Sequence, residues 1–384
     1  MSNHRKKLLF FLPNNIMKGS GGERCLYYYL KFLPVDIFEA IVIQTDYADF
    51  PRLKLDELDP IKSIKFVTLH DYFNKFSFMA DSVLMSAILS FLINPILSFI
   101  FKRKYRRILK FADFADIIYL FVNDNFRLFK NSEARIIGSN HGSFKKPIGI
   151  FKKIQILLVR TKLIQKRIDG YHIFPGTFPD NELLGRPFDF VLPPLGIDTS
   201  TFVPSESSSQ KIRFLYVGRL ENFKGIPFLI QLWKRIGDNK TFEFVIVGNG
   251  SLLSLVKNCG FENVILHEDV SINELATIYA NSDVFLFPTK SEAYPQVIME
   301  ALSSGLYVMT SDVIKGTFDN FEKIGHLLYL PENIESYCKE IFKITRKIDK
   351  IRLRKWEIHD IVKQEYDIKN TIKRFYEVLT SMIS

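Results

Sequence analysis

The sequence contains few cysteines for its length. Only three occur among the 384 residues, Cys25, Cys259 and Cys338, and they are odd in number and far apart. This spacing is unlike the paired cysteines of disulfide-rich folds or the close clusters of zinc sites. We therefore expect neither a disulfide framework nor a cysteine-held metal, and we expect the chain to work in a reducing compartment.

Long uncharged apolar runs are also scarce, with one exception. Residues 82–101, "SVLMSAILSFLINPILSFIF", are uncharged and long enough to span a bilayer, and "KRKYRRILK" follows with six bases. Asn94-Pro95 would break a helix near its middle, which argues against a span. A buried helix pair and a helix lying in the membrane interface are the alternatives. The adjacent bases favour the interface, because clustered Lys and Arg attract anionic headgroups.

An excess of acidic residues is absent from both halves of the chain. The net charge is +10, and residues 1–200 carry 29 Lys and Arg against 19 Asp and Glu, whereas bases and acids balance in residues 201–384. This asymmetry predicts that the first half meets an anionic partner, such as phospholipid, nucleic acid or a phosphorylated substrate. The bases are not interleaved with a motif that reads RNA or DNA, which argues against nucleic acid.

Short apolar runs alternate with longer helical patterns, and no internal repeat stands out. The first half includes "KLLFFL", "EAIVIQ", "DIIYLFV", "ARIIGSNHG" and "YHIFPG", and the second half includes "KIRFLYVGRL", "TFEFVIVGNG", "NVILHED", "DVFLFPT" and "LYVMTSD". Apolar runs that end at Gly, Asn or Asp and lead into helices are typical of parallel sheets covered on both faces. The pattern predicts an α/β chain with two doubly wound, Rossmann-like domains.

A linker separates the two series of strands. The segment "LPPLGIDTSTFVPSESSSQK" holds three prolines and a polar run before the next strand. We therefore expect an N-terminal domain at residues 1–195 and a C-terminal domain at residues 196–365. Residues 366–384 are expected to form a helix that crosses back to the N-terminal domain.

Glycine-rich turns follow two of the predicted strands. "GSGGER" places Gly21 and Gly22 before the first predicted helix, and "VIVGNGS" runs into Gly248. Glycines at such positions let backbone N–H groups approach a diphosphate, or let a nucleotide base or phosphate come close to the backbone. For each motif an ordinary tight turn is the open alternative.

Charged side chains follow other predicted strands. Arg219 and Lys224 lie in "VGRLENFKG", where two cations beyond the carboxyl end of a parallel strand suit a diphosphate. His141, in "SNHGSF", can donate to a substrate hydroxyl or to a transferring group. Solvated surface bases and a structural histidine are the alternatives.

The segment "DVFLFPTKSEAYPQVIMEALSSG" is the most informative part of the sequence. It predicts a strand, a loop and a helix that ends at Gly305, with Glu292 in the loop and Glu300 on the helix. The spacing of the two glutamates is uninformative alone. The position of this glutamate pair, after an apolar strand and around the start of a helix of small residues, makes the segment a candidate site.

In this order and spacing, the motifs resemble the retaining nucleotide-sugar glycosyltransferases of family 4, also called group 1 glycosyltransferases. Members have the GT-B fold, in which two Rossmann-like domains face each other across a cleft. Their second domain carries Gly-Arg, Lys-Gly, Gly-Asp/Asn-Gly, Pro-Ser/Thr and Glu-x7-Glu motifs. This chain offers "VGRLENFKG", "VGNGS" and "FPTKSEAYPQVIMEALSSG", and the resemblance extends over nearly the whole chain.

The resemblance implies a role for each matching residue. Arg219 and Lys224 would hold the donor diphosphate, and Glu300 would hold the ribose hydroxyls. Glu292 would contact the donor sugar near the reacting carbon, and His141 would approach the transferred sugar. Further donor contacts would come from the backbone of Gly21, Gly22, Gly248, Gln296, Val297 and Ile298.

The family also implies a reaction and its partners. We expect a retaining hexosyltransferase that uses a nucleotide sugar and no metal, because two cations can stabilise the leaving diphosphate. A lipid-linked or membrane-presented glycan is the expected acceptor, with an anionic membrane surface as partner. The expected location is the cytoplasmic face of the plasma membrane. A soluble acceptor and a nucleotide-sugar epimerase are the alternatives, and a non-catalytic nucleic-acid binder is a remote one.

The chain departs from the family pattern beside its first glutamate. Tyr294-Pro295 stands where the family usually has Phe-Gly. Proline has no N–H and cannot adopt positive φ. We therefore expect that one backbone contact to the phosphate is missing or reshaped here.

Overall fold

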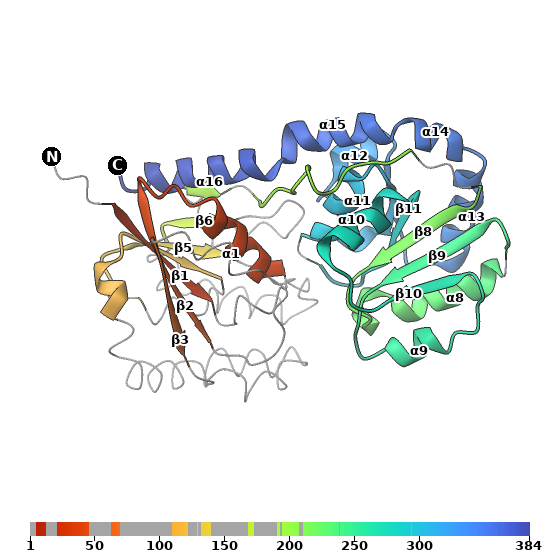
Figure 1. Cartoon of the computed structure of the whole chain (residues 1–384), viewed down its shortest axis with the longest axis horizontal. Helices are drawn as coiled ribbons and strands as arrows, with labels where there is room; N and C mark the ends of the chain where they lie inside the picture. Colours follow the sequence, from red (N-terminus) through yellow and green to blue (C-terminus); the bar gives the residue numbers. More distant parts are fainter. Residues whose placement is uncertain are drawn as a thin grey trace, which may run out of the picture. The chain divides into compact units, whose positions relative to one another are not determined.

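The computed structural model describes residues 5–12, 21–45, 63–69, 110–121, 129, 132–139, 168–172, 190–192, 194–206, 210–237, 239–292 and 294–384. The chain divides into two compact units, which are coloured along the sequence in Figure 1. Unit 1 comprises Met1–Ile173, Phe178–Pro194 and Thr371–Ser384, and unit 2 comprises Phe174–Thr177 and Leu195–Asn370.

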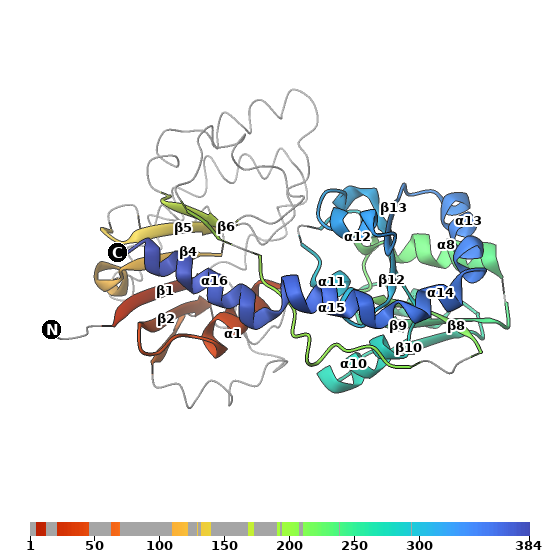
Figure 2. The same cartoon turned by 90° about the horizontal axis from the view of Figure 1, so that it is seen from above.

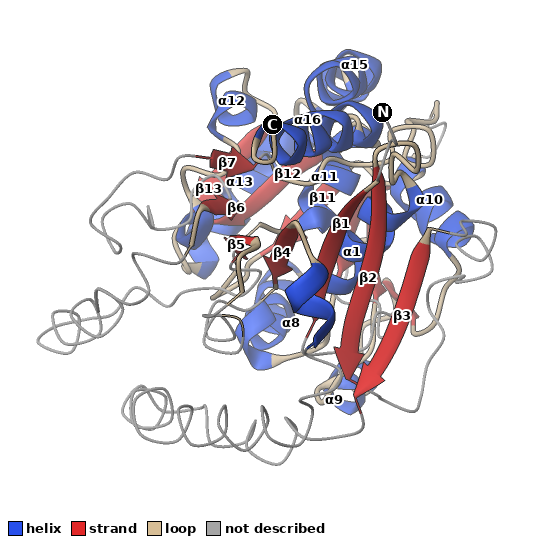
Figure 3. Cartoon of the chain, turned by 90° about the vertical axis from the view of Figure 1, so that its left-hand side faces the viewer, coloured by secondary structure: helices blue, strands red, loops and turns tan. Residues whose placement is uncertain are grey.

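Unit 1 is built on a parallel sheet with the described strand order β3-β2-β1-β4-β5-β6-β7. Leu8 to Leu12 are buried at every position, as expected for a parallel strand that is covered on both faces. The strands, red in Figure 3, are β1 (Lys6–Leu12), β2 (Phe38–Thr45), β3 (Ile64–Leu69), β4 (Ile117–Leu120), β5 (Arg135–Ser139), β6 (Gly170–His172) and β7 (Phe190–Leu192).

The C-terminal helix supplies part of the core of unit 1. The described helices of this unit are α1 (Gly21–Lys31), η5 (Lys110–Phe114) and α16 (Ile368–Ser381), the last of which ends the chain in Figure 2. The Phe375 ring of α16 stacks on the Tyr29 ring of α1 with centroids 4.1 Å apart. The Tyr376 hydroxyl also donates to the Tyr29 carbonyl at 2.6 Å. The end of the chain is therefore bound to α1 by both packing and hydrogen bonding.

Unit 2 is built on a second parallel sheet, with the strand order β10-β9-β8-β11-β12-β13. The strands are β8 (Ile212–Val217), β9 (Phe242–Val247), β10 (Val264–His267), β11 (Val284–Phe287), β12 (Tyr307–Ser311) and β13 (Leu327–Leu330). The helices are η7 (Asn222–Lys224), α8 (Ile226–Ile236), α9 (Leu253–Lys257), α10 (Ile272–Ala280), α11 (Gln296–Ser303), η8 (Asp312–Ile314), α12 (Asp319–Lys323), α13 (Ile334–Thr345), α14 (Ile348–Leu353) and α15 (Lys355–Tyr366).

The chain path explains why helices cover both faces of this sheet. From β8 the strands proceed in one direction to β10, and from β11 they proceed in the other direction to β13. Right-handed crossovers in opposite directions place their helices on opposite faces. α8 packs beside α13, and α11 packs beside α15. The predicted α/β architecture with two doubly wound parallel sheets is confirmed.

The predicted membrane-facing segment at residues 82–101 lies outside the described residues. Among the helices that the structure describes, none combines the length and apolarity that crossing a bilayer requires.

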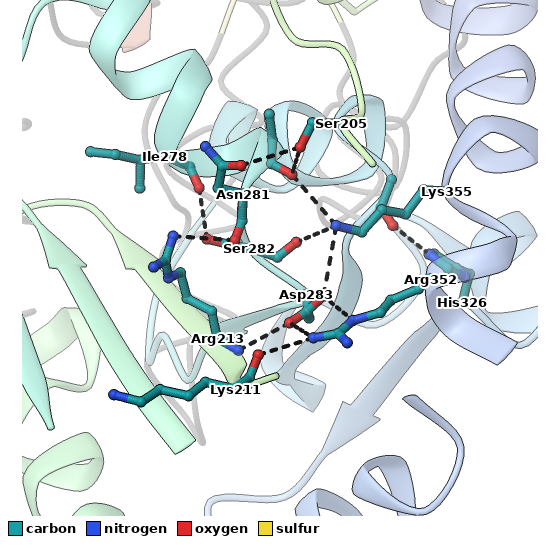
Figure 4. Close-up of polar contacts among 12 residues, drawn as sticks. Ser205, Lys211, Arg213, Ile278, Asn281, Ser282, Asp283, His326, Arg352 and Lys355 are labelled. Carbon is teal, nitrogen blue, oxygen red and sulfur yellow. Dashed lines mark hydrogen bonds and ion pairs between the residues drawn. The ribbon is translucent and has the colours of Figure 1, made fainter. Parts of the chain in front are cut away.

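A buried charge network joins α14 and α15 to the amino end of the second sheet (Figure 4). Asp283, immediately before β11, is fully buried, and Arg352 donates to its two carboxylate oxygens at 2.9 Å each. The backbone N–H of Arg213 donates to the same carboxylate at 3.0 Å. Lys355 Nζ lies 3.7 Å from it and donates to the Ser282 carbonyl at 2.7 Å. Burial lowers the pKa of Lys355, and the carboxylate opposes this effect.

We predict that Asp283→Asn destabilises the protein by about 3 kcal/mol or more, because it leaves the buried Lys355 and the partly exposed Arg352 without their anion. Urea unfolding of unit 2 would measure this loss. Asp360→Asn, at an exposed position of α15, is the matched control and should change stability by less than about 0.5 kcal/mol. Equal stability of the two variants would show that the network contributes nothing.

Candidate functional site

The predicted cations and the first glutamate follow adjacent strands of the second sheet. β8 and β11 pair in parallel, so their carboxyl ends lie side by side, at the end of the sheet that is called the carboxyl edge below. The order of the strands reverses between these two strands. In open α/β sheets, ligands bind at such a switch point, outside the carboxyl ends of the strands. Arg219 and Lys224 follow β8, and Glu292 follows β11.

Hydrogen bonds join the loops at this edge. The Phe223 carbonyl, after β8, accepts from the Lys290 N–H at 2.8 Å and from the Thr289 Oγ1 at 3.4 Å, both after β11. The Leu220 N–H donates to the Asn249 carbonyl, after β9, at 2.9 Å. The positions of the loop side chains are therefore coupled through the backbone.

Lys224 and Glu292 form an ion pair, in which Lys224 Nζ donates to Glu292 Oε1. Their side chains are only 12% and 20% exposed. Burial, and then the nearby Arg219 guanidinium, lower the pKa of Lys224 to about 8. The Glu292 carboxylate opposes this change, because it favours the charged amine. Lys224 is thus a largely desolvated cation whose charge can change near neutral pH.

Arg219 is exposed and lies against an aromatic ring. Its Cζ is 5.1 Å from the centroid of the Phe223 ring. Among the described residues, no carboxylate forms an ion pair with its guanidinium. A guanidinium in this position can bind an oxyanion through two parallel N–H groups.

The start of α11 adds backbone donors to the same edge. Pro295 is the N-cap residue (φ −73°, ψ 104°) and has no N–H to offer. The N–H groups of Gln296 and Val297 have no acceptor in the described parts of the chain, whereas the Ile298 N–H donates to the Pro295 carbonyl at 3.1 Å. Two of the three predicted backbone donors are therefore available, at a helix end that favours anions.

Because Pro295 has no N–H, the departure at Tyr294-Pro295 changes which backbone N–H group is the first donor at the start of α11. The first available N–H belongs to Gln296, and its side-chain Nε2 donates to the Leu195 carbonyl at 3.3 Å. The Tyr294 ring packs on Phe318 with centroids 5.5 Å apart. The aromatic residue that replaces the family's Phe is thus held by ring packing.

Glu300 lies in the interior rather than at the surface. Its side chain is 0% exposed, and the Tyr279 hydroxyl donates to its Oε2 at 3.0 Å. Tyr279 belongs to α10, and its hydroxyl oxygen also lies 3.3 Å from the Val297 carbonyl oxygen, which can share the same proton. Sequence reasoning missed Tyr279, whose only signal was a tyrosine in the helix that precedes β11. The ribose-binding role of Glu300 stays a prediction.

The glycines of the two predicted motifs occupy different structural positions. A Cβ on Gly248 would lie 1.9 Å from the Gly218 carbonyl oxygen, and the Gly248 N–H donates to the His267 carbonyl at 2.9 Å. The close approach of two loops therefore requires Gly248. Gly21 and Gly22 are the first two residues of α1 in unit 1. His141 lies outside the described residues.

Residues 211–347 match the family model described as "Glycosyl transferases group 1". This range contains all six strands of the second sheet and the site residues Arg219, Lys224, Glu292 and Glu300. Residues 211–347, here called the group 1 domain, are therefore similar in sequence to the group 1 glycosyl transferases. The family resemblance that the motifs indicated is thereby confirmed, and the narrower assignment to family 4 stays a prediction.

Named glycosyltransferases match part of this chain over part of their own length. The chain is 30% identical over 165 residues to TuaC of Bacillus subtilis, named as a teichuronic acid biosynthesis glycosyltransferase, with 40% of this chain and 41% of TuaC covered. It is 28% identical over 188 residues to the UDP-Gal:alpha-D-GlcNAc-diphosphoundecaprenol alpha-1,3-galactosyltransferase of Escherichia coli, with 43% of this chain and 47% of the relative covered. In both cases the match spans less than half of the relative.

A solved structure extends the likeness beyond the group 1 domain. The Anabaena protein Alr3699/HepE, crystallised in complex with UDP-glucose, superposes with a TM-score of 0.68 and 15% identity. The match covers 97% of this chain and 99% of that chain. This likeness includes both units and confirms the GT-B fold class.

We predict that binding of a nucleoside diphosphate weakens as the pH rises through about 8. Below that pH, Lys224 is protonated and attracts the diphosphate, and above it the attraction is lost. Calorimetric titration between pH 7 and 9 would measure the affinity. Lys224→Arg stays charged throughout and should flatten the profile. A wild-type profile as flat as that of the variant would exclude Lys224 as the titrating contact.

Proposed function

We propose that the protein is a retaining hexosyltransferase. It transfers a sugar from a nucleotide-sugar donor to a hydroxyl of a lipid-linked or membrane-presented glycan, in the synthesis of a cell-surface polysaccharide or glycolipid. One observation carries the proposal: Arg219, Lys224 and the available N–H groups of α11 lie at the switch point between β8 and β11.

This edge has the chemistry that the departure of a nucleoside diphosphate needs. Negative charge develops on the leaving diphosphate, and preorganised cations and N–H donors stabilise it. Arg219 and Lys224 supply the cations, and the first turn of α11 supplies the donors. In this proposal they take the place of a metal ion. Glu292 is held beside Lys224 and would accept hydrogen bonds from hydroxyls of the donor sugar.

The other end of the donor is assigned to Glu300. Two ribose hydroxyls can donate to one carboxylate. Because Glu300 is fully buried, this contact requires neighbouring side chains to move when the donor binds. The Tyr279 hydroxyl already donates to Glu300, and it would hold the carboxylate in place during that change.

Names of relatives and the charge of the chain support the acceptor class. The Escherichia coli relative is named for a diphosphoundecaprenol-linked acceptor, and TuaC is named for teichuronic acid biosynthesis. The Anabaena protein was crystallised with UDP-glucose, which makes UDP-sugars the first donors to test. The basic excess in residues 1–200 suits an anionic membrane surface. We infer a peripheral location at the inner face of the plasma membrane.

We predict transfer of a labelled hexose from a UDP-sugar to a polyprenyl-diphosphate-linked acceptor, without added metal. Mass spectrometry and NMR of the product would identify the linkage and its anomeric configuration. Retention of the donor configuration supports the proposal, and inversion contradicts the mechanism. Turnover without an acceptor, with the nucleotide still attached to the sugar, would instead identify an epimerase. Absence of transfer from UDP-, GDP- and ADP-hexoses would reject the function.

Two variants assign the ends of the donor in the same assay. Well below pH 8, where Lys224 stays protonated, Glu292→Gln should lower kcat about 10²-fold but bind the nucleoside diphosphate no more weakly, since it removes a negative charge beside Lys224. Glu300→Gln should weaken that binding about tenfold or more, through loss of charged hydrogen bonds. Glu335→Gln, at an exposed position of α13, is the control. Wild-type kinetics in both site variants would show that the assignment is wrong.

A further inference from the structure

The ring of Phe223 lies close to both cations of the candidate site. The Arg219 Cζ is 5.1 Å and the Lys224 Nζ is 5.2 Å from the centroid of its ring. Both distances are within the reach of cation–π attraction, which extends to about 6 Å. The ring is 38% exposed, so burial in the core does not account for a large apolar side chain at this position. Its neighbours point to an electrostatic role.

The backbone of Phe223 is held independently of its side chain. Its carbonyl accepts from the Lys290 N–H and the Thr289 Oγ1 across the edge of the sheet. Gly225, in the left-handed conformation (φ 83°), ends the short helix η7 and leads into α8. A Cβ on Gly225 would lie 2.1 Å from the Pro288 carbonyl oxygen. These contacts fix the position of the ring and remain when only the ring is changed.

Arg219 and Lys224 carry like charges and repel each other, and the Phe223 ring can offset this repulsion. Because of this repulsion, Arg219 adds to the effect of burial in lowering the pKa of Lys224. Glu292 contacts Lys224, whereas Arg219 attracts the Glu221 carboxylate without forming an ion pair with any described carboxylate. The negative face of an aromatic ring attracts a cation without occupying its N–H groups. A guanidinium held by its flat face keeps its edge free for an oxyanion.

We propose that Phe223 is a positioning residue for the donor diphosphate, whose ring holds Arg219 and Lys224 close together without occupying their N–H groups. This inference rests on the proposed function. Without the ring, repulsion separates two long side chains, and each must be ordered again when the diphosphate binds. An aromatic ring is required for this role, because an aliphatic side chain of similar size has no negative face.

The test compares Phe223→Leu with Phe223→Tyr by calorimetric titration of UDP, GDP and ADP. Ordering costs of this kind predict a dissociation constant about 3- to 10-fold higher for the leucine variant. The tyrosine variant should bind within about twofold of wild type, since it keeps the ring. Both variants should melt within about 2 °C of wild type, because the ring is partly exposed and the backbone contacts remain.

Phe342→Leu is the matched control. Phe342 is 46% exposed on α13, and its ring lies 6.4 Å from that of Phe242, at the amino end of β9. It is therefore at the opposite edge of the sheet, and its loss should leave the affinity unchanged. Equal affinities of wild type and Phe223→Leu, or equal losses in the leucine and tyrosine variants, would overturn the inference alone. If wild type binds none of the three nucleotides, the proposed function fails, and this inference fails with it.

Discussion

The parallel pairing of β8 with β11 is the constraint on which the candidate site depends. Phe214 and Leu215 of β8 lie opposite Val284 and Phe285 of β11, so both strands end at the same edge. This register brings Lys224 and Glu292 into contact although they are 68 residues apart in the sequence. The chain leaves the two strands in opposite directions, which keeps the space outside this pair free of a crossover helix. The sheet therefore provides both the convergence of the loops and the room for a ligand.

Charge is balanced differently at the two ends of the strands in the second sheet. At the amino end, Asp283 is satisfied by Arg352, Lys355 and a backbone N–H, and the network secures α14 and α15. At the carboxyl end, positive charge is only partly balanced, because Glu292 contacts Lys224 while Arg219 rests against a neutral ring. A fully satisfied network stabilises the fold, whereas incomplete neutralisation leaves a site that attracts an anion.

Sequence reasoning found the features that one segment of chain encodes by itself. The apolar runs that end in Gly-Arg or Gly-Asn-Gly correctly predicted β8 and β9, and the motif around Glu292 correctly predicted β11 and α11. It missed β3, β7 and β13, which lack such an ending. It also missed side chains that act through distant neighbours. Tyr279 and Thr289 matter because they contact residues that are distant in the sequence. Phe223 contacts cations that are near it in the sequence, but only the fold shows that its ring lies against them.

The central claim is that the edge formed by β8, β11 and the start of α11 binds the diphosphate of a nucleotide sugar. A crystal structure of the protein with a bound nucleoside diphosphate tests it most directly. The account predicts phosphate oxygens within hydrogen-bonding distance of Arg219, Lys224 and the N–H groups of Gln296 and Val297. A diphosphate bound elsewhere on the chain, with Arg219 and Lys224 uninvolved, would contradict it.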